Sequence, residues 1–253
     1  MLTAVLLALI GSADLWRSWG RARGTVFVVV GIAAGWVAVV VLATTGLGVP
    51  LQLVALCVLA AGAWLWLTTP DEHEAGRAGR AAVVGLLALV VLLFLFDRTA
   101  LGASGYLVDG HRGSASALLR EAPLAAVATV LGAALFLCES ANIVVRIALR
   151  SPAQSSRAEP EETDLTRVDL KGGRLIGPLE RLLIVALVLT GFPPIVAALV
   201  AAKGIVRFPE IADDVRKGDG LSGTKAEYFL VGSLVSWTVA GAAVGLIAIS
   251  AHS

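Results

Sequence analysis

Residues 173–207 read GRLIGPLERLLIVALVLTGFPPIVAALVAAKGIVR and decide how the rest of the chain is interpreted. Between Arg181 and Lys203 lie 21 residues without a charge, a length that suits one crossing of the hydrocarbon core of a bilayer. The middle of that stretch, however, reads Gly-Phe-Pro-Pro at 191–194. Proline lacks an amide hydrogen and clashes with the preceding helical turn, so a continuous helix should kink or end there. The stretch therefore predicts a membrane-embedded element at 176–207 that proline interrupts.

The composition of the whole chain agrees with a membrane protein. Hydrophobic residues make up 57% of the 253 residues, charged residues make up 15%, and the mean hydropathy is +0.85. A soluble globular domain has roughly 45–50% apolar and about 25% charged residues. The formal net charge is only +1, which argues against a nucleic-acid partner because such proteins need a basic face. Membrane lipid is therefore the expected partner.

Long apolar runs separated by polar loops predict an all-α fold, a polytopic transmembrane helical bundle. We expect six or seven membrane-embedded helices plus the proline-interrupted element. The apolar runs outside that element are 2–15, 25–45, 50–69, 81–96, 124–147 and 226–250. The first run has no basic segment before it, so it is expected to be a retained helix and not a cleaved signal peptide.

The same pattern divides the chain into three parts. Residues 1–150 are predicted to form a five-helix transmembrane part, in which the Gly- and Ser-rich stretch 101–121 is an external loop. Residues 151–172 contain prolines and an acidic cluster and are predicted to be a polar cytoplasmic linker. Residues 173–253 hold the broken or re-entrant helix and the last transmembrane helix.

The positions of the basic residues bear on whether the interrupted element crosses the membrane. If it crosses once, 12 of the 20 Lys and Arg residues lie on the inner side and 8 on the outer side. If it enters and returns, the segment 203–225 joins the inner side and the division becomes 17 to 3. Because positive residues in short loops prefer the cytoplasm, the re-entrant hairpin is favoured. Each arm would have about ten residues and reach roughly the midplane. A single kinked crossing remains the alternative, because the uncharged length suits one span.

Glu139 is the clearest candidate for a functional charge, because it lies well inside the apolar run 124–147. A charge in the hydrocarbon region is costly, so it marks either function or a paired structural contact. Asn142 and Arg146 follow it by three and seven residues, which places all three on one face of a continuous helix. One interpretation is an ion or solute pathway with Glu139 as ligand or proton carrier. The other is a structural Glu139 that pairs with an arginine.

A second group of charges surrounds the ends of the interrupted element. It comprises Glu180, Arg181, Lys203, Arg207, Glu210 and Glu227. In the hairpin both arms return to one surface, so Glu180 can meet Lys203 or Arg207. The group is interpreted as a gate or a site for an anionic headgroup, or else as an interfacial ion-pair cluster that fixes the hairpin.

Other polar residues in or near apolar runs receive structural interpretations. Asp14 is expected to be a boundary residue near an interface. Cys57 and Cys138 lie inside apolar runs, where cysteine behaves as a small buried hydrophobe. Asp109 and His111 lie close together, but two ligands do not make a metal site.

Several chemical classes are excluded by what the sequence lacks. None of its three histidines lies in an apolar run, which argues against haem ligation and against an intramembrane Ser-His protease. One deep carboxylate is too few for an aspartate-pair protease, and no phosphate-binding glycine loop is present. We therefore expect no enzymatic activity, no catalytic residues, no cofactor and no metal.

Glycines spaced four residues apart occur at Gly31 and Gly35 and again at Gly241 and Gly245. Such spacings let helix backbones approach closely. Packing within the chain is the favoured interpretation, and the same glycine-rich faces would also allow a homo-oligomer.

The last third of the chain contains the motifs Gly177-x-Leu179-Glu180-Arg181, Ala201-Ala202-Lys203-x-x-x-Arg207-Phe208 and Glu227-Tyr228-x-Leu230-x-Gly232. With these motifs it resembles the C-terminal part of an uncharacterised family of bacterial membrane proteins. The resemblance implies a bacterial origin and a fold, and it assigns no catalytic residue. A multi-pass protein of the bacterial plasma (inner) membrane is therefore expected.

These observations predict a channel or transporter for a small ion or small solute, with the buried carboxylate of Glu139 in the pathway and the interrupted element as its gate. The alternative is a membrane scaffold or sensor that binds a cytoplasmic partner through its charged inner loops.

Overall fold

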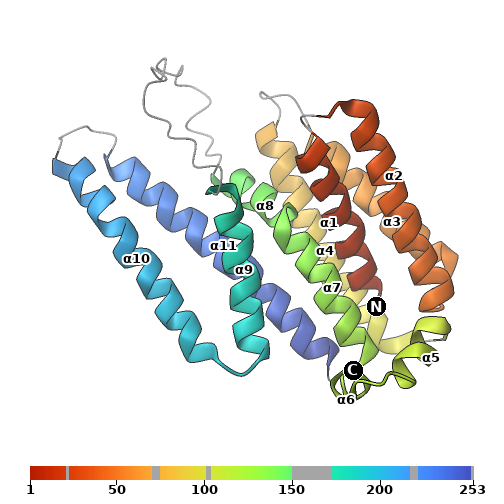
Figure 1. Ribbon diagram of the computed structural model, residues 1–253. Helices are drawn as coiled ribbons and strands as arrows, with labels where there is room; N and C mark the ends of the chain where they lie inside the picture. The colour runs from red at the N-terminus through yellow and green to blue at the C-terminus, as the bar shows by residue number, and fades with distance from the viewer. Residues whose placement is uncertain (21–22, 70–74, 101–103, 150–172, 217–221, 252–253) are drawn as a thin grey trace.

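The computed structural model describes residues 1–20, 23–69, 75–100, 104–149, 173–216 and 222–251. The helices are, in order, α1 (Leu2–Gly20), α2 (Thr25–Val41) with the π-helical extension η1 (Leu42–Gly46), α3 (Leu51–Leu67), α4 (Ala75–Ala100), α5 (Tyr106–Arg112), α6 (Ala117–Glu121), α7 (Leu124–Cys138), α8 (Ser140–Leu149), α9 (Gly173–Leu189), α10 (Pro193–Arg216) and α11 (Ser222–Ser250). The regular structure of the described residues is all helical, so the predicted all-α fold class is confirmed. The short helices α5 and α6, which lie in the expected external loop, are at the lower end of the molecule in Figure 1.

Helix α1 is the central helix of the N-terminal bundle. It packs against α2, α3, α4 and α7, and its buried residues point to every side of the helix. Two glycines allow the close approach of α1 and α7. A Cβ atom on Gly11 would lie 2.5 Å from the backbone carbon of Leu135, and one on Gly132 would lie 2.5 Å from the carbonyl oxygen of Ala4. These contacts between backbones set the distance between the two helices.

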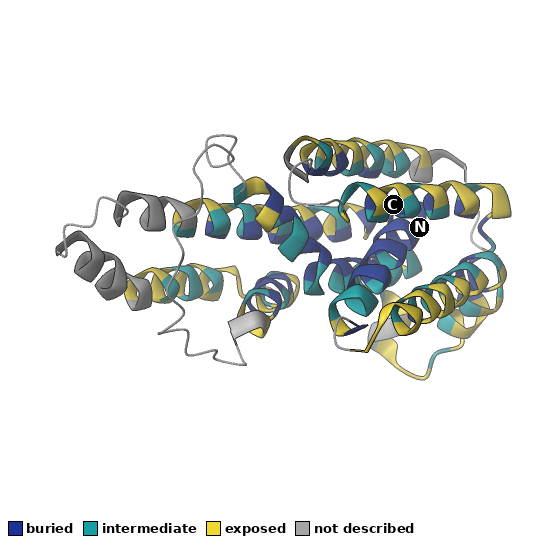
Figure 2. Cartoon of the chain, turned by 90° about the horizontal axis from the view of Figure 1, so that it is seen from above, coloured by how far each residue is buried: buried dark blue, intermediate teal, exposed yellow. Residues whose placement is uncertain are grey.

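The outer helices carry apolar side chains on their outward faces. Three helical stretches are long and apolar enough to cross a membrane, Thr25–Gly46, Arg77–Phe96 and Phe229–Ser250. The first has a mean hydropathy of 2.8, yet only 11% of it is buried, and Figure 2 shows exposed residues along the outer faces of the molecule. Exposed apolar surface of this extent is unfavourable in water, which supports a membrane protein.

The expected count of six or seven membrane-embedded helices is not supported by length and composition. The three stretches above pass, and α7 and α8 would make a fourth if the bent pair is one span. Helix α1 contains Asp14 and Arg17 within its 19 residues, and α3 has only 17 residues. Polar residues and short length are therefore the physical reasons for the lower count.

The interrupted element forms a hairpin of α9 and α10, which run in opposite directions (Figure 1). Helix α9 ends shortly before Gly191, whose φ of 84° favours glycine. The Phe192 amide donates to the Leu187 carbonyl at 2.8 Å and the Gly191 amide to the Val188 carbonyl at 3.2 Å, which are the two bonds of a Schellman motif. Helix α10 begins at Pro193, where an amide hydrogen would have no helical partner. The predicted stop at the glycine and start at the proline are thus confirmed.

The two arms of this hairpin are longer than the charge pattern predicts. Helix α9 has 17 residues and α10 has 24, because helical structure continues through Arg181 and through Lys203. At 1.5 Å per residue α9 is roughly 25 Å long, which approaches the thickness of a bilayer core instead of half of it. The predicted linker 151–172 lies outside the described residues.

The glycine pairs have different environments. A Cβ atom on Gly31 would lie 2.4 Å from the ring of Trp16, and one on Gly35 would lie 3.5 Å from the indole nitrogen of the same ring. This pair therefore serves packing between α2 and α1. Gly241 and Gly245 on α11 have no described atom within 4 Å of such a Cβ.

Candidate functional site

The predicted fifth span is broken at Glu139, the residue on which the functional interpretation depends. Helix α7 ends at Cys138, α8 begins at Ser140, and the two helices are bent by 50°. Glu139 lies between them with φ −129° and ψ −41°, and it is half-buried. Arg146 lies beyond the bend on α8, where it is exposed. The bend replaces the continuous helical face that the sequence predicts for Glu139 and Arg146.

Arg181 of α9 reaches this break from the side and is only 2% exposed. Its Nε donates to the Leu137 carbonyl at 3.0 Å, one Nη to Ser236 Oγ at 3.2 Å and the other Nη to Asn142 Oδ1 at 2.6 Å. The Nδ2 atom of Asn142 lies 3.5 Å from Glu139 Oε2. The guanidinium therefore satisfies a carbonyl in the last turn of α7, which a helix end leaves without an intrahelical partner. We call Arg181, Asn142, Glu139 and Ser236 the Arg181 cluster.

On the other side of the break, Ser140 contacts Asp14 of α1. The Asp14 side chain is 0% exposed. Its Oδ2 accepts from Ser140 Oγ at 2.6 Å and from Trp64 Nε1 at 3.0 Å, and its Oδ1 accepts from Arg17 Nη1 at 3.0 Å. We call Asp14, Ser140, Trp64 and Arg17 the Asp14 cluster. Side chains of α3 and α8 cover the carboxylate of Asp14, so it is buried within the bundle, and its place near a membrane interface stays a prediction.

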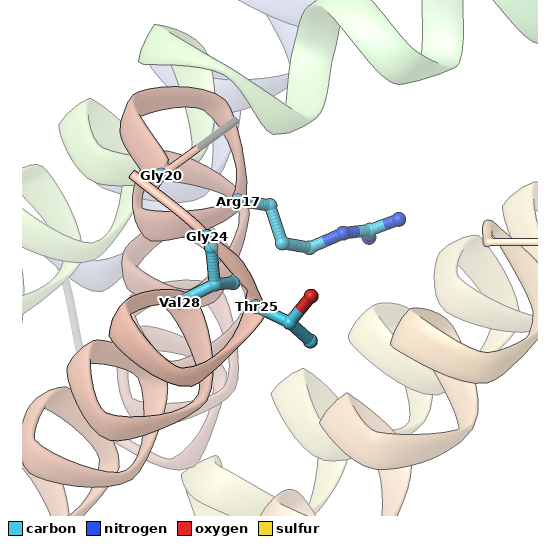
Figure 3. A pocket seen from close by; sticks show the side chains of 5 residues that line it. All are labelled: Arg17, Gly20, Gly24, Thr25 and Val28. Atoms are coloured by element: carbon cyan, nitrogen blue, oxygen red, sulfur yellow. The ribbon is translucent and has the colours of Figure 1, made fainter. Parts of the chain in front are cut away.

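The Asp14 cluster reaches the surface through Arg17. The Arg17 side chain is 24% exposed, and its Nη2 donates to Thr69 Oγ1 at 3.0 Å. It lines an open pocket of about 320 Å³ between the end of α1 and the start of α2. The other residues that line this pocket are Gly20, Gly24, Thr25 and Val28. Figure 3 shows Arg17 and Thr25 pointing to the same side of the two helices.

Glu180 and Lys203 join the two arms of the hairpin. The Lys203 Nζ lies 2.6 Å from Glu180 Oε2, which is the contact expected if both arms return to one surface. Trp237 of α11 donates from Nε1 to Glu180 Oε1 at 2.8 Å. The Lys203 Nζ also lies 5.5 Å from the centre of the Trp237 ring and 5.9 Å from that of Phe229, which are distances of cation–π contacts. We call Glu180, Lys203, Trp237 and Phe229 the Glu180 cage.

The other predicted charges belong to α10 and α11. Arg207 and Glu210 lie within α10, and Glu227 lies within α11. Their side chains lie outside the described part of the chain, so the structure neither adds them to the Glu180 cage nor separates them from it. The contacting residues that sequence reasoning did not assign to a site are Asp14, Arg17, Trp64, Ser140, Ser236, Phe229 and Trp237. A carboxylate inside an apolar run was the one signal for the first of these, and the rest have ordinary polar or aromatic positions in the sequence.

The Asp14 cluster and the Arg181 cluster place one carboxylate each on either side of the α7–α8 break. Asp14 lies next to Arg17, and Glu139 lies next to the Asn142 amide that Arg181 contacts. Charges inside an apolar bundle either line a pathway or pair with one another. Within the described ranges, no group of three or more His, Cys, Asp or Glu side chains could hold a metal ion.

Comparison with known protein families, with curated proteins and with solved structures finds no match to this chain. The resemblance of the last third of the chain to an uncharacterised family of bacterial membrane proteins therefore stays a prediction.

Proposed function

We propose that this chain is a multi-pass protein of the bacterial plasma membrane that acts as a channel or transporter for a small ion or small solute. Glu139 lies on the pathway, and the hairpin of α9 and α10 acts as its gate. In this proposal α1 and α3 are embedded in the membrane together with the longer apolar helices, and the hairpin enters the membrane and returns to the same side.

The observation that carries the proposal is a line of polar side chains through the α7–α8 break. Arg17, beside the surface pocket, contacts Asp14, which contacts Ser140. Glu139 precedes Ser140 in the sequence and is linked to Arg181 through the side-chain amide of Asn142. Charges inside a membrane are retained where they line a pathway or pair with one another. Non-helical backbone is tolerated at membrane depth where protein or a water-filled cavity surrounds it. The break at Glu139 combines both features.

Flux into liposomes tests this proposal. Purified protein is reconstituted into liposomes that contain a pH dye, a Na⁺ indicator or a K⁺ indicator, and an outward or inward gradient of each ion is imposed. Glu139→Gln keeps the size of the side chain and removes its charge. It is expected to lower the initial flux by roughly tenfold or more, because a neutral amide neither carries a proton nor balances a cation.

Glu121→Gln is the matched control for this flux experiment. Glu121 is an exposed carboxylate on α6, outside both clusters, so its replacement should leave the flux unchanged. Equal flux from Glu139→Gln and the unmodified protein would remove Glu139 from the pathway.

A membrane scaffold or sensor is the second candidate, and one observation favours it. Among the described residues, Thr3 Oγ1 is the one buried side-chain nitrogen or oxygen without a hydrogen-bond partner. A polar network with satisfied bonds rigidifies a single structure, which suits a static scaffold. Deletion of 151–169 separates the two candidates. For a scaffold, the deletion releases a co-purifying cytoplasmic partner and the unmodified protein shows no flux; for a transporter, the unmodified protein shows flux.

A further inference from the structure

The ammonium group of Lys203 is enclosed by groups that proteins use to bind organic cations. A carboxylate oxygen of Glu180 lies 2.6 Å from Nζ, and the rings of Trp237 and Phe229 lie 5.5 Å and 5.9 Å away. Aromatic faces attract ammonium ions through their quadrupoles, and cages of this kind recognise choline and methylated amines. The Glu180 cage therefore has the composition of an ammonium-binding site.

The carboxylate and the two rings of the cage come from α9 and α11, and Glu180 and Trp237 contact each other without Lys203. The Glu180 side chain is only 7% exposed, and its second oxygen is fixed by the indole Nε1 of Trp237 at 2.8 Å. If the lysine leaves, the carboxylate keeps this bond and its orientation toward the ring. A charged carboxylate in such a place still requires a cation beside it.

Lys203 is placed so that it can leave. Its side chain is 27% exposed, in contrast to the buried carboxylate that it contacts. It lies on α10, which packs against α9 and α11 at the edge of the molecule (Figure 1). A lysine ammonium is a compact charge on a flexible four-carbon stem, so it moves with little rearrangement of the backbone.

We propose that Glu180, Trp237 and Phe229 form a binding site for an organic ammonium group, which Lys203 fills as a tethered ligand and which an external ammonium compound occupies after displacing it. The site selects a cation and not the anionic headgroup that the charge pattern suggests, because Glu180 neutralises the lysine. The proposal does not rest on Glu139 or Asp14, since none of these three residues contacts either of them in the interactions described above, although the Glu180–Lys203 contact belongs to the hairpin proposed as the gate. The ammonium group belongs either to a lipid headgroup or to a free amine, which share this chemistry.

Chemical acetylation of Lys203 in the unmodified protein tests the displacement. Protein in an uncharged detergent is treated with an amine-reactive acetylating reagent, with tetramethylammonium chloride or with sodium chloride at the same concentration. Mass spectrometry gives the acetylation rate at Lys203 relative to the other three lysines of the chain, Lys171, Lys217 and Lys225. Tetramethylammonium should raise the relative rate at Lys203 several-fold above the rate in sodium chloride. Equal rates in the two salts overturn the proposal.

A binding measurement with variants gives an independent test. Saturation-transfer NMR of the tetramethylammonium methyl groups is expected to give roughly tenfold tighter binding to Lys203→Ala than to the unmodified protein, because the tethered competitor is gone. Adding Trp237→Leu to that variant should abolish the gain. Adding Trp66→Leu instead, which removes an indole that is 79% exposed on α3, should leave the gain intact. Equal loss with both tryptophan variants, or no gain from Lys203→Ala, contradicts the cage.

The source of the ammonium group is identified in nanodiscs. A lipid headgroup as ligand predicts faster acetylation of Lys203 in phosphatidylcholine nanodiscs than in phosphatidylglycerol nanodiscs, without added salt. A free amine as ligand predicts the same rate in both lipids and a rise only when tetramethylammonium is added. The same rate in both lipids with no response to tetramethylammonium contradicts an ammonium site of either kind.

Discussion

The Asp14 cluster and the Glu180 cage contain the same three chemical groups, but the carboxylate has a different number of partners in each. Each has a carboxylate that accepts a hydrogen bond from an indole N–H and pairs with a cation. In the Asp14 cluster the indole is Trp64 and the cation is Arg17. In the Glu180 cage the indole is Trp237 and the cation is Lys203. The first is built on α1, which other helices surround, and the second lies where α10 packs on the edge of the molecule (Figure 1).

This difference separates a fixed contact from an exchangeable one. Asp14 has an additional donor in Ser140, and its carboxylate ties α1 to α3 and α8. If one of these side chains is removed, the surrounding helices keep water from the buried polar groups that remain. The hydrogen bonds that those groups lose are therefore not replaced by bonds to water. In the Glu180 cage the carboxylate has two partners, Trp237 and Lys203, and the Lys203 side chain is 27% exposed, so another cation is able to take its place. We therefore expect the same chemical change to have unequal effects in the two places.

The largest expected effect is that of Asp14→Ala. It leaves Arg17, Trp64 and Ser140 without their common acceptor, and removal of one partner from a buried ion pair costs about 3–5 kcal/mol. The free energy of unfolding, measured by titration with sodium dodecyl sulfate in mixed micelles, should fall by that amount. Asp14→Asn keeps one acceptor oxygen and should lose clearly less. If the alanine variant is as stable as the unmodified protein, the carboxylate is not the buried anchor described here.

Arg181→Leu is expected to have the next largest effect, about 3 kcal/mol, because three acceptors around the α7–α8 break lose a buried charged donor. Arg181 is adjacent in sequence to Glu180 but points into the bundle. This variant therefore tests whether a fixed contact lies directly next to the exchangeable contact of Glu180. Ser236→Ala removes one of its three bonds and should cost about 0.6 kcal/mol, the average for hydrogen bonds between membrane helices. Equal losses in the two variants would show that the arginine contributes one bond and not three.

Gly132→Ala tests whether α1 owes its central place to the close approach of α7. The added methyl would meet the backbone of α1, and overpacking of this kind costs about 1–3 kcal/mol. Gly241→Ala on α11, where no described atom lies within 4 Å, is the matched control and should change stability by less than about 0.5 kcal/mol. Both values come from the same detergent titration. A larger loss at Gly241 would indicate a contact with a second copy of the chain.

Local chemistry explains the part of the fold that the sequence predicts correctly. The stop at Gly191 and the start at Pro193 follow from backbone rules that act over a few residues. The contact between Glu180 and Lys203 follows from that hairpin, because its turn fixes which residues of the two arms face each other. The apolar runs likewise predict where helices form, although α4 and α11 extend into the neighbouring polar residues.

The bend at Glu139 and the burial of Asp14 could not be predicted, because their causes lie far away in the sequence. Residues 136–142 read FLCESAN and contain neither proline nor glycine, so no local rule ends the helix there. The bend is accompanied by hydrogen bonds from Arg181 and to Asp14, which are 44 and 126 positions from the residues they contact. Asp14 lies near the polar end of its apolar run, and nothing in that run indicates that α3 and α8 pack over its carboxylate.

Lys203→Met is expected to have the smallest effect and bears most directly on the comparison. It keeps the apolar length of the side chain and removes the charge from a pair whose cation is 27% exposed, so that another cation from solution is able to take its place beside Glu180. The detergent titration should therefore show a loss several times smaller than that of Asp14→Ala, although both changes break a carboxylate–cation–indole group. A loss as large as that of Asp14→Ala would mean that Glu180 has no access to water or to another cation once the lysine is gone. The Glu180 cage would then be a second buried anchor, and an external ammonium compound would have no route into it.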